Sequence, residues 1–192
     1  MYLIFIPVIL IVVWVVGLYN FFVTAKTRIK ASIQEIGNQL KRQADLIPNL
    51  EASAKGYLAH EKDIFDKLTD ARKAVQSAVK SGDTQKMADA GSLLNDVLPK
   101  LQVVVESNPE IKGAEVIKGL MDELRDTSDK LMYARRILID LSADFNAKLV
   151  TFPTNIVANL FGFKEEKGLS TPETGAHMEV SEAETKSPKV NL

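Results

Sequence analysis

The chain has 192 residues, of which 24 are Lys or Arg and 25 are Asp or Glu, and it contains no Cys and two His. The absence of Cys excludes disulfide scaffolds, thiolate zinc sites and Cys nucleophiles, and two His leave little for histidine catalysis or metal binding. A formal net charge of -1 argues against a dedicated nucleic-acid-binding protein, which usually carries a basic excess.

Residues 1–25 contain no charged side chain and predict a transmembrane anchor, because about 20 apolar residues span the hydrocarbon core of a bilayer. A cleaved signal peptide is the main alternative, since small residues occur at positions 23–25. The retained anchor is favoured because no Lys or Arg precedes the apolar run and because the run is long for a signal peptide. A core helix buried on all sides is the weakest interpretation for a chain of this size.

Lys26, Arg28 and Lys30 follow the anchor, whereas only the α-amino group precedes it. The positive-inside rule therefore predicts a single-pass protein with its N-terminus outside and its C-terminal domain in the cytoplasm. The same three bases could contact anionic lipid headgroups. The alternative is an ordinary solvated helix face.

Residues 26–163 predict an all-α, antiparallel up-and-down bundle of three to four long helices, because no segment alternates with the period of a strand. From Ile29 to Ala78, apolar residues recur at steps of three and four in one heptad register. Pro48 falls within this run and predicts a kink or a break in the helix. A break gives four helices, and an unbroken run gives three.

Three further helices are predicted in residues 84–163. The first runs from Thr84 to about Val105, with Asp83 or Ser81 as its N-terminal cap. A long helix covers about 114–151, and a short helix capped by Thr154 follows it. The apolar residues of the long helix repeat every seven positions. They are Ile117, Leu124, Leu131, Leu138 and Phe145.

Residues 164–192 are polar and have few bulky apolar side chains. Such a segment cannot bury enough surface to offset the entropy of ordering, so a disordered tail is predicted. The chain thus divides into an anchor (1–25), a helical bundle (26–163) and a tail (164–192).

No motif for catalysis, a metal or a cofactor is found. His60 and Glu61 begin like a zincin motif, but Ile64 stands where the second His is needed. The chain also lacks a glycine-rich phosphate loop. The sequence therefore predicts no catalytic residue, no metal and no cofactor.

Several polar residues fall within or beside the apolar seams of the predicted helices. Polar groups in a bundle core must be hydrogen-bonded or paired. The favoured interpretation is that they fix helix pairing and register, and the alternative is that they form a binding groove. These residues are Arg42, Asp45, Glu61, Arg72, Arg135 and Asn146.

The run LKRQADLIPNL at residues 40–50, followed by Lys55-Gly56-Tyr57 and His60-Glu61, resembles the signature of the LemA family. The similarity covers roughly residues 15–163 and adds Asn49, Tyr57 and His60 to the candidate residues. Further matches are Ala71-Arg72, Ala134-Arg135, Phe145-Asn146 and Phe152-Pro153. The chain departs from the family at Asn108, where the family usually has Tyr before the proline.

The resemblance implies a bacterial inner-membrane protein with one transmembrane helix, an external N-terminus and a helical bundle. It transfers no catalytic residue, because the family has no established molecular function.

The favoured hypothesis is a non-catalytic scaffold or adaptor that contacts the lipid bilayer and a protein partner. No nucleic acid is expected to bind, and a homo-oligomer is left open. A lipid-binding or membrane-organising protein is the alternative. An enzyme ranks third, and would require Asp45, His60, Glu61 and Arg72 to converge on one pocket.

Overall fold

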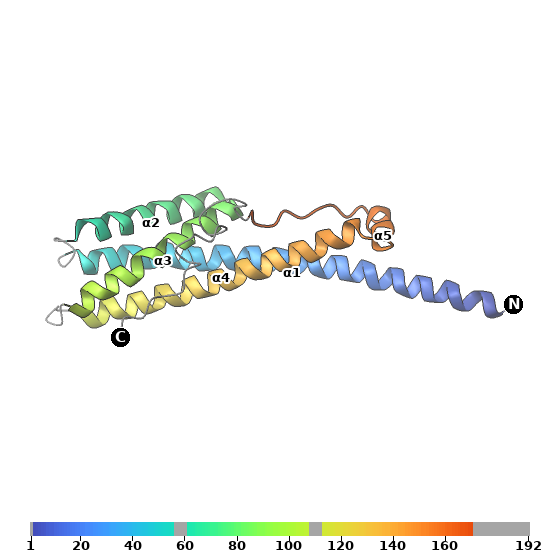
Figure 1. The fold of residues 1–192 in the computed structure, drawn as a ribbon, viewed down its shortest axis with the longest axis horizontal. Helices are drawn as coiled ribbons and strands as arrows, with labels where there is room; N and C mark the ends of the chain where they lie inside the picture. Colours follow the sequence, from blue (N-terminus) through green and yellow to red (C-terminus); the bar gives the residue numbers. More distant parts are fainter. Residues whose placement is uncertain (1, 56–60, 108–112, 171–192) are drawn as a thin grey trace, which may run out of the picture.

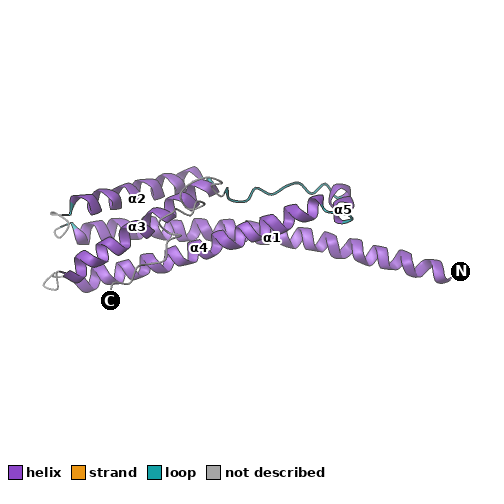
Figure 2. Cartoon of the chain, in the orientation of Figure 1, coloured by secondary structure: helices purple, strands orange, loops and turns teal. Residues whose placement is uncertain are grey.

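The computed structural model describes residues 2–55, 61–107 and 113–170, and it contains only helices and their connections within these ranges (Figures 1 and 2). The predicted all-α bundle is confirmed. The five helices are α1 (Tyr2–Ala54), α2 (Lys62–Ser81), α3 (Thr84–Ser107), α4 (Ala114–Val150) and α5 (Thr154–Leu160).

Helices α1 and α4 are the two long members of the bundle, and they run side by side over most of the length of α4 (Figure 1). Helices α2 and α3 pack on the part of this pair that is far from the N-terminus, where they complete a four-helix head. Beyond α5, the part of α1 that precedes Tyr19 projects alone from the bundle (Figure 1).

The heptad positions form the core. On α4, all five residues of the predicted repeat are buried, from Ile117 to Phe145. On α1, the seam from Ile29 through Leu40 to Leu50 is also buried. Steps of three and four place these side chains on one face of each helix, so the seams meet where the helices pack together.

Of the two outcomes that the sequence leaves open at Pro48, a kink or a break, the break does not occur, because α1 continues through Pro48 to Ala54. A proline removes one backbone hydrogen bond, but the neighbouring Ile47 and Leu50 are fully buried and hold this turn against the bundle. The chain instead leaves the helix after Ala54, and α2 begins at Lys62. The heptad register of the sequence therefore continues from α1 into α2 across the connection between them, although these are two separate helices.

One of the two predicted caps is confirmed. The Lys86 amide donates to Oδ1 of Asp83 at 3.0 Å, so Asp83 caps α3. The expectation for Thr154 is wrong, because its hydroxyl donates to the carbonyls of Lys148 (2.6 Å) and Thr151 (2.8 Å) and does not accept from α5.

Residues 164–170, which we name the strap, are extended and pack along α4, unlike the disordered tail predicted from residue 164 onward. The Asn146 side chain explains the difference, because its amide pairs with the strap as a neighbouring strand would. Its Nδ2 donates to the Glu166 carbonyl at 2.9 Å, and the Glu166 amide donates to its Oδ1 at 3.0 Å. Leu169 packs against the core, and the Ser170 amide donates to Gln85 at 2.8 Å. The rest of the predicted tail, 171–192, lies outside the described residues.

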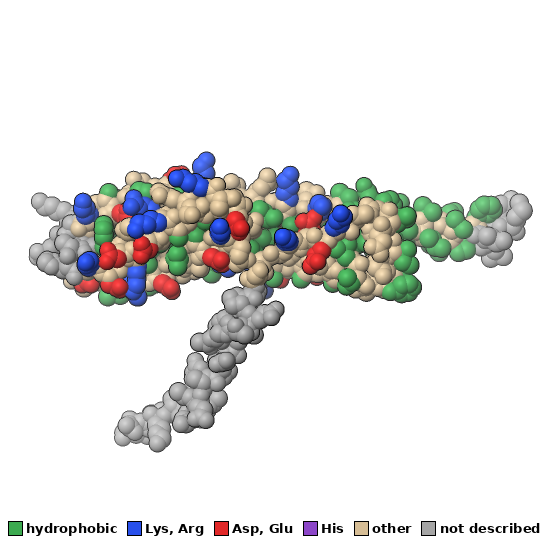
Figure 3. Space-filling view, turned by 90° about the horizontal axis from the view of Figure 1, so that it is seen from above, with side chains coloured by type: hydrophobic (Ala, Val, Ile, Leu, Met, Phe, Trp, Pro, Cys, Tyr) green, Lys and Arg blue, Asp and Glu red, His purple; other side chains and the backbone are tan. Residues whose placement is uncertain are grey.

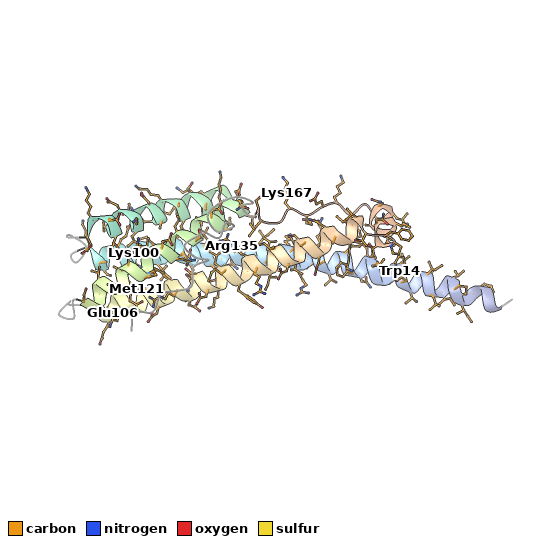
Figure 4. The ribbon with its side chains drawn as sticks, in the orientation of Figure 1. Trp14, Lys100, Glu106, Met121, Arg135 and Lys167 are labelled. Carbon is orange, nitrogen blue, oxygen red and sulfur yellow. The ribbon has the colours of Figure 1, made fainter. Side chains whose placement is uncertain are left out.

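Helix α1 is the one helix in the described part of the chain that is long and apolar enough to cross a membrane. The rest of the chain covers almost none of the apolar part of α1. Trp14 marks this bare part in Figure 4.

Candidate functional site

Four of the six seam residues selected from the sequence lie in separate contacts that join two segments of the fold, spread along the bundle. Arg42 of α1 reaches across to Glu123 of α4. Its Nη2 and Nε both donate to Oε1 of Glu123, at 2.5 and 3.1 Å. The hydrogen bond with Glu123 and the charge of Glu123 raise the pKa of Arg42 above its usual value. Both side chains are solvent-exposed, so the pair specifies how the helices face each other more than it stabilises the fold.

Gln43 and Ser128 make a second contact between α1 and α4, and this one is buried. Nε2 of Gln43 donates to Oγ of Ser128 at 3.2 Å. Gln43 interrupts the apolar series in the sequence, but Ser128 lies 85 residues away and gives no signal of its own.

Arg72 of α2 faces Glu51 of α1, with Nε 3.1 Å from Oε2. Glu51 is only 9% exposed, so Arg72 neutralises a carboxylate that has lost most of its water. Sequence reasoning missed Glu51, because an acid in a charged helix resembles a surface residue.

Two further seam residues, Arg135 and Asn146, bind backbone groups. Nη1 of Arg135 on α4 donates to the Ala88 carbonyl of α3 at 3.1 Å. Asn146 binds both backbone groups of Glu166 in the strap. Each selected residue that is partly buried thus joins two segments of the fold.

The remaining candidates do not complete a pocket. Asp45 is exposed, and its carbonyl accepts from Nδ2 of the equally exposed Asn49 at 3.3 Å. Glu61 is exposed, and its carbonyl accepts the Ile64 and Phe65 amides at the start of α2. Tyr57 and His60 lie outside the described residues.

The arrangement of the described acids offers little for chemistry. Arg72 pairs with Glu51, whereas Asp45 and Glu61 are exposed. Arg72, Asp45 and Glu61 therefore do not line one common pocket. Within residues 2–55, 61–107 and 113–170, no group of three or more metal-binding side chains is close enough to hold an ion.

Two hollows lie end to end between α1 and α4 and share Arg28 and Leu141, so together they form one groove. The hollow farther from the N-terminus is lined mostly by apolar atoms, and its residues include Ala31, Ala134 and Ile137. Its rim carries Glu35 and the 68% exposed Tyr133. The hollow nearer the N-terminus is lined by Gly17, Asn20, Phe21, Thr24, Ala25 and Asp144 besides the shared residues.

The three bases after the anchor do not all lie on one side of α1. Nζ of Lys26 lies 2.6 Å from Oε1 of Glu166 in the strap. Arg28 lines the groove, and Lys30 is exposed. Lys30 follows Lys26 by one helical turn, so Lys26 and Lys30 share a face while Arg28 lies on another, and the three do not form a single basic patch.

Comparison with known proteins agrees with the LemA resemblance. The sequence model of the LemA family matches residues 32–191. Magnetosome protein MamQ of Magnetospirillum gryphiswaldense is 26% identical over 169 residues, an alignment that covers 76% of this chain and 62% of the relative. Magnetosome proteins MamQ 1 and MamQ 2 of Paramagnetospirillum magneticum show the same identity and coverage. The chain therefore spans less than two thirds of the length of these relatives.

The family match, the helical bundle and the bare apolar helix lead to one conclusion. The chain belongs to the LemA family and is a membrane-associated helical protein.

Proposed function

We propose that this protein is a single-pass protein of the bacterial inner membrane whose cytoplasmic bundle acts as a non-catalytic scaffold. Its partner is a protein that docks an amphipathic helix between α1 and α4, in the hollow of the groove farther from the N-terminus. Three features support the proposal: the anchor continues into the bundle without a linker, Arg72, Arg135 and Asn146 each join two segments of the fold, and an apolar groove lies open between α1 and α4.

The groove carries the proposal. Successive residues of a helix are rotated by about 100° around its axis. Residues that face the strap and residues that line the groove can therefore be assigned to different sides of each helix. The strap contacts Lys26, Ser142 and Asn146, whereas Arg28 and Leu141 line the groove. The strap therefore covers one side of the α1–α4 pair, and the groove opens on the other.

The composition of the groove suits a helix. Its floor is apolar, and its rim carries the exposed ring of Tyr133 together with Arg28 and Glu35. Amphipathic helices bind such grooves with apolar anchors at helical spacing, and rim charges select the partner and its direction.

The test is site-specific photocrosslinking in cells. A photoreactive amino acid replaces Tyr133 in the groove or, as a matched control, Gln76 on the exposed outer face of α2. We expect a discrete crosslinked protein from position 133 and none from position 76. If position 133 gives no discrete product, or the same products as position 76, the groove is not the partner site.

A membrane-organising role is the second candidate. It is favoured by the three bases of α1 that follow the apolar part, among which Lys26 and Arg28 lie on different sides of the helix. Full-length protein reconstituted into anionic vesicles should then change vesicle shape in electron micrographs. Replacing Lys26, Arg28 and Lys30 by Gln should remove this effect, and an unchanged effect would exclude these bases as its cause.

A further inference from the structure

The end of the bundle beside the bare part of α1 is unusually apolar. Residues 149–163, which connect the end of α4 through α5 to the strap, contain no Asp, Glu, Lys, Arg or His. We name the large exposed apolar side chains of this segment the apolar base. They are Val150, Phe152, Ile156, Leu160 and Phe161. In Figure 3, apolar side chains gather at this end of the bundle, and the charged side chains lie farther from the bare helix.

The apolar base is fixed to a known depth along α1. The ring of Phe161 lies 4.9 Å from that of Tyr19, centroid to centroid. Phe163 stacks on Phe22 at 4.8 Å, and Phe145 of α4 meets Phe22 edge-on at 5.4 Å. The base therefore sits level with Tyr19 to Phe22 of the anchor helix.

For an α1 that spans the membrane, this depth lies within the bilayer. A spanning helix uses roughly 20 residues to cross the hydrocarbon core. A span of that length placed anywhere between Tyr2 and Ala25 ends at Phe21 or beyond, so it includes Tyr19. Because Phe161 rests on Tyr19, the apolar base reaches the same leaflet.

The backbone of the segment suits an apolar medium, in which unpaired amides and carbonyls are costly. At the end of α4, the Thr151 amide donates to the Ala147 carbonyl at 3.0 Å. After α5, the Gly162 amide donates to the Asn159 carbonyl at 3.2 Å, and the Phe163 amide donates to the Ala158 carbonyl at 3.0 Å.

Positive charge begins immediately outside the segment. Lys148 precedes it and Lys164 follows it. Nζ of Lys148 lies 4.8 Å from the centre of the Phe21 ring, and Lys26 is held by Glu166 of the strap. Lysines at this level can reach the headgroup region while their aliphatic stems cover apolar surface.

We propose that the apolar base is a second membrane contact, in which α5 and the turn before it insert into the leaflet on the bundle side. The protein then touches the bilayer at the anchor and at the end of α4, and this fixes the rotation of the bundle about the anchor. The inference rests on the proposed function only in requiring that α1 spans the membrane.

The test uses full-length protein in vesicles of phosphatidylethanolamine and phosphatidylglycerol that contain nitroxide-labelled lipid. A single cysteine at Leu160→Cys carries an environment-sensitive fluorophore. Val116→Cys at the far end of α4 is the matched control, since the two wild-type side chains are 73% and 60% exposed apolar residues of helices. We expect the lipid to quench the probe at 160 severalfold more than the probe at 116. Phe152→Cys in the turn before α5 provides a second site with the same expectation.

Equal quenching at 160, 152 and 116 would overturn the proposal. A probe at 160 that is shielded from water but not quenched by lipid would also overturn it, because a protein surface would then cover the base. Trp14, the one Trp of the chain, reports on the anchor itself in unlabelled protein. Quenched Trp14 with unquenched 160 rejects the second contact alone, whereas unquenched Trp14 rejects the anchor as well.

Discussion

The ion pair between Glu51 and Arg72 is unequal, because Glu51 is buried and Arg72 keeps partial access to water. Replacing Arg72 by Met leaves a buried carboxylate without its cation, and we expect a loss of about 1–3 kcal/mol in unfolding free energy. Replacing Glu51 by Met leaves a cation that can turn to solvent, so the expected loss is below about 1 kcal/mol. Chemical unfolding in detergent micelles, followed by circular dichroism, measures both. Equal losses would contradict this account of the pair.

Gln43 and Ser128 form a buried polar contact that holds α1 and α4 in register. Ser128→Ala leaves the Gln43 amide without its acceptor, and we expect a loss of about 1–3 kcal/mol in unfolding free energy. The double variant Gln43→Leu, Ser128→Ala removes both partners and should recover most of that loss. A double variant less stable than Ser128→Ala would show that the polar contact itself stabilises the bundle.

The sequence identifies one member of each polar contact but not its partner. Arg42, Arg72 and Asn146 stand out because they interrupt an apolar seam or belong to a family motif. Glu123 and Glu51 do not stand out, because each lies among other charged residues, and Glu123 is 81 positions from the arginine it binds. Only the way the helices pair selects these acids from the many on the surface.

At the scale of elements, Gly91 sets the distance between α3 and α4. A Cβ added at Gly91 would lie 1.9 Å from Cδ2 of Leu131, which is buried in the core, so Leu131 would have to shift within close packing. We expect Gly91→Ala to lower the unfolding free energy by about 1–3 kcal/mol, even though Ala favours helix.

Gly119 of α4 is the matched control, because a Cβ added there meets no atom within 4 Å. Gly119→Ala should raise the unfolding free energy by about 0.5–1 kcal/mol through helix propensity alone. The same unfolding experiment measures both variants. Stabilisation by Gly91→Ala would mean that α3 and α4 pack less closely than described.

The elements themselves are largely predictable, and their ends are less so. Heptad spacing identifies the core face of α4 from Ile117 to Phe145, because burial and period coincide there. The same spacing does not predict the end of α1 at Ala54, because the heptad register of α1 continues unchanged into α2. Pro48 carries the strongest local signal for a break, but buried neighbours on both sides hold the helix through it.

At the scale of the whole molecule, α1 runs without interruption from its bare apolar part into the bundle (Figure 1). In the proposed arrangement the bundle therefore stands directly on the membrane without a flexible linker. The open groove between α1 and α4 begins beside the anchor, and the strap closes the opposite side. A partner in this groove would therefore meet the bundle close to the membrane surface.

The membrane contacts differ in how far the sequence predicts them. The anchor follows from its length and lack of charge. The apolar base cannot be predicted from the sequence, because residues 149–163 are too short to span a bilayer. Only the fold shows that α4 brings this segment to the level of Tyr19 on α1. The strap was missed because its order depends on Asn146, which lies 20 residues before the Glu166 backbone that it binds.

The central claim is that the groove-bearing bundle lies in the cytoplasm, and topology tests it most directly. The chain has no native Cys, so Gln76→Cys on the exposed face of α2 provides a single probe. The account predicts that a membrane-impermeant thiol reagent labels this cysteine only after the cells are lysed. Labelling in cells whose outer membrane alone has been opened would contradict it and would place the bundle, and any partner in its groove, on the outer side of the inner membrane.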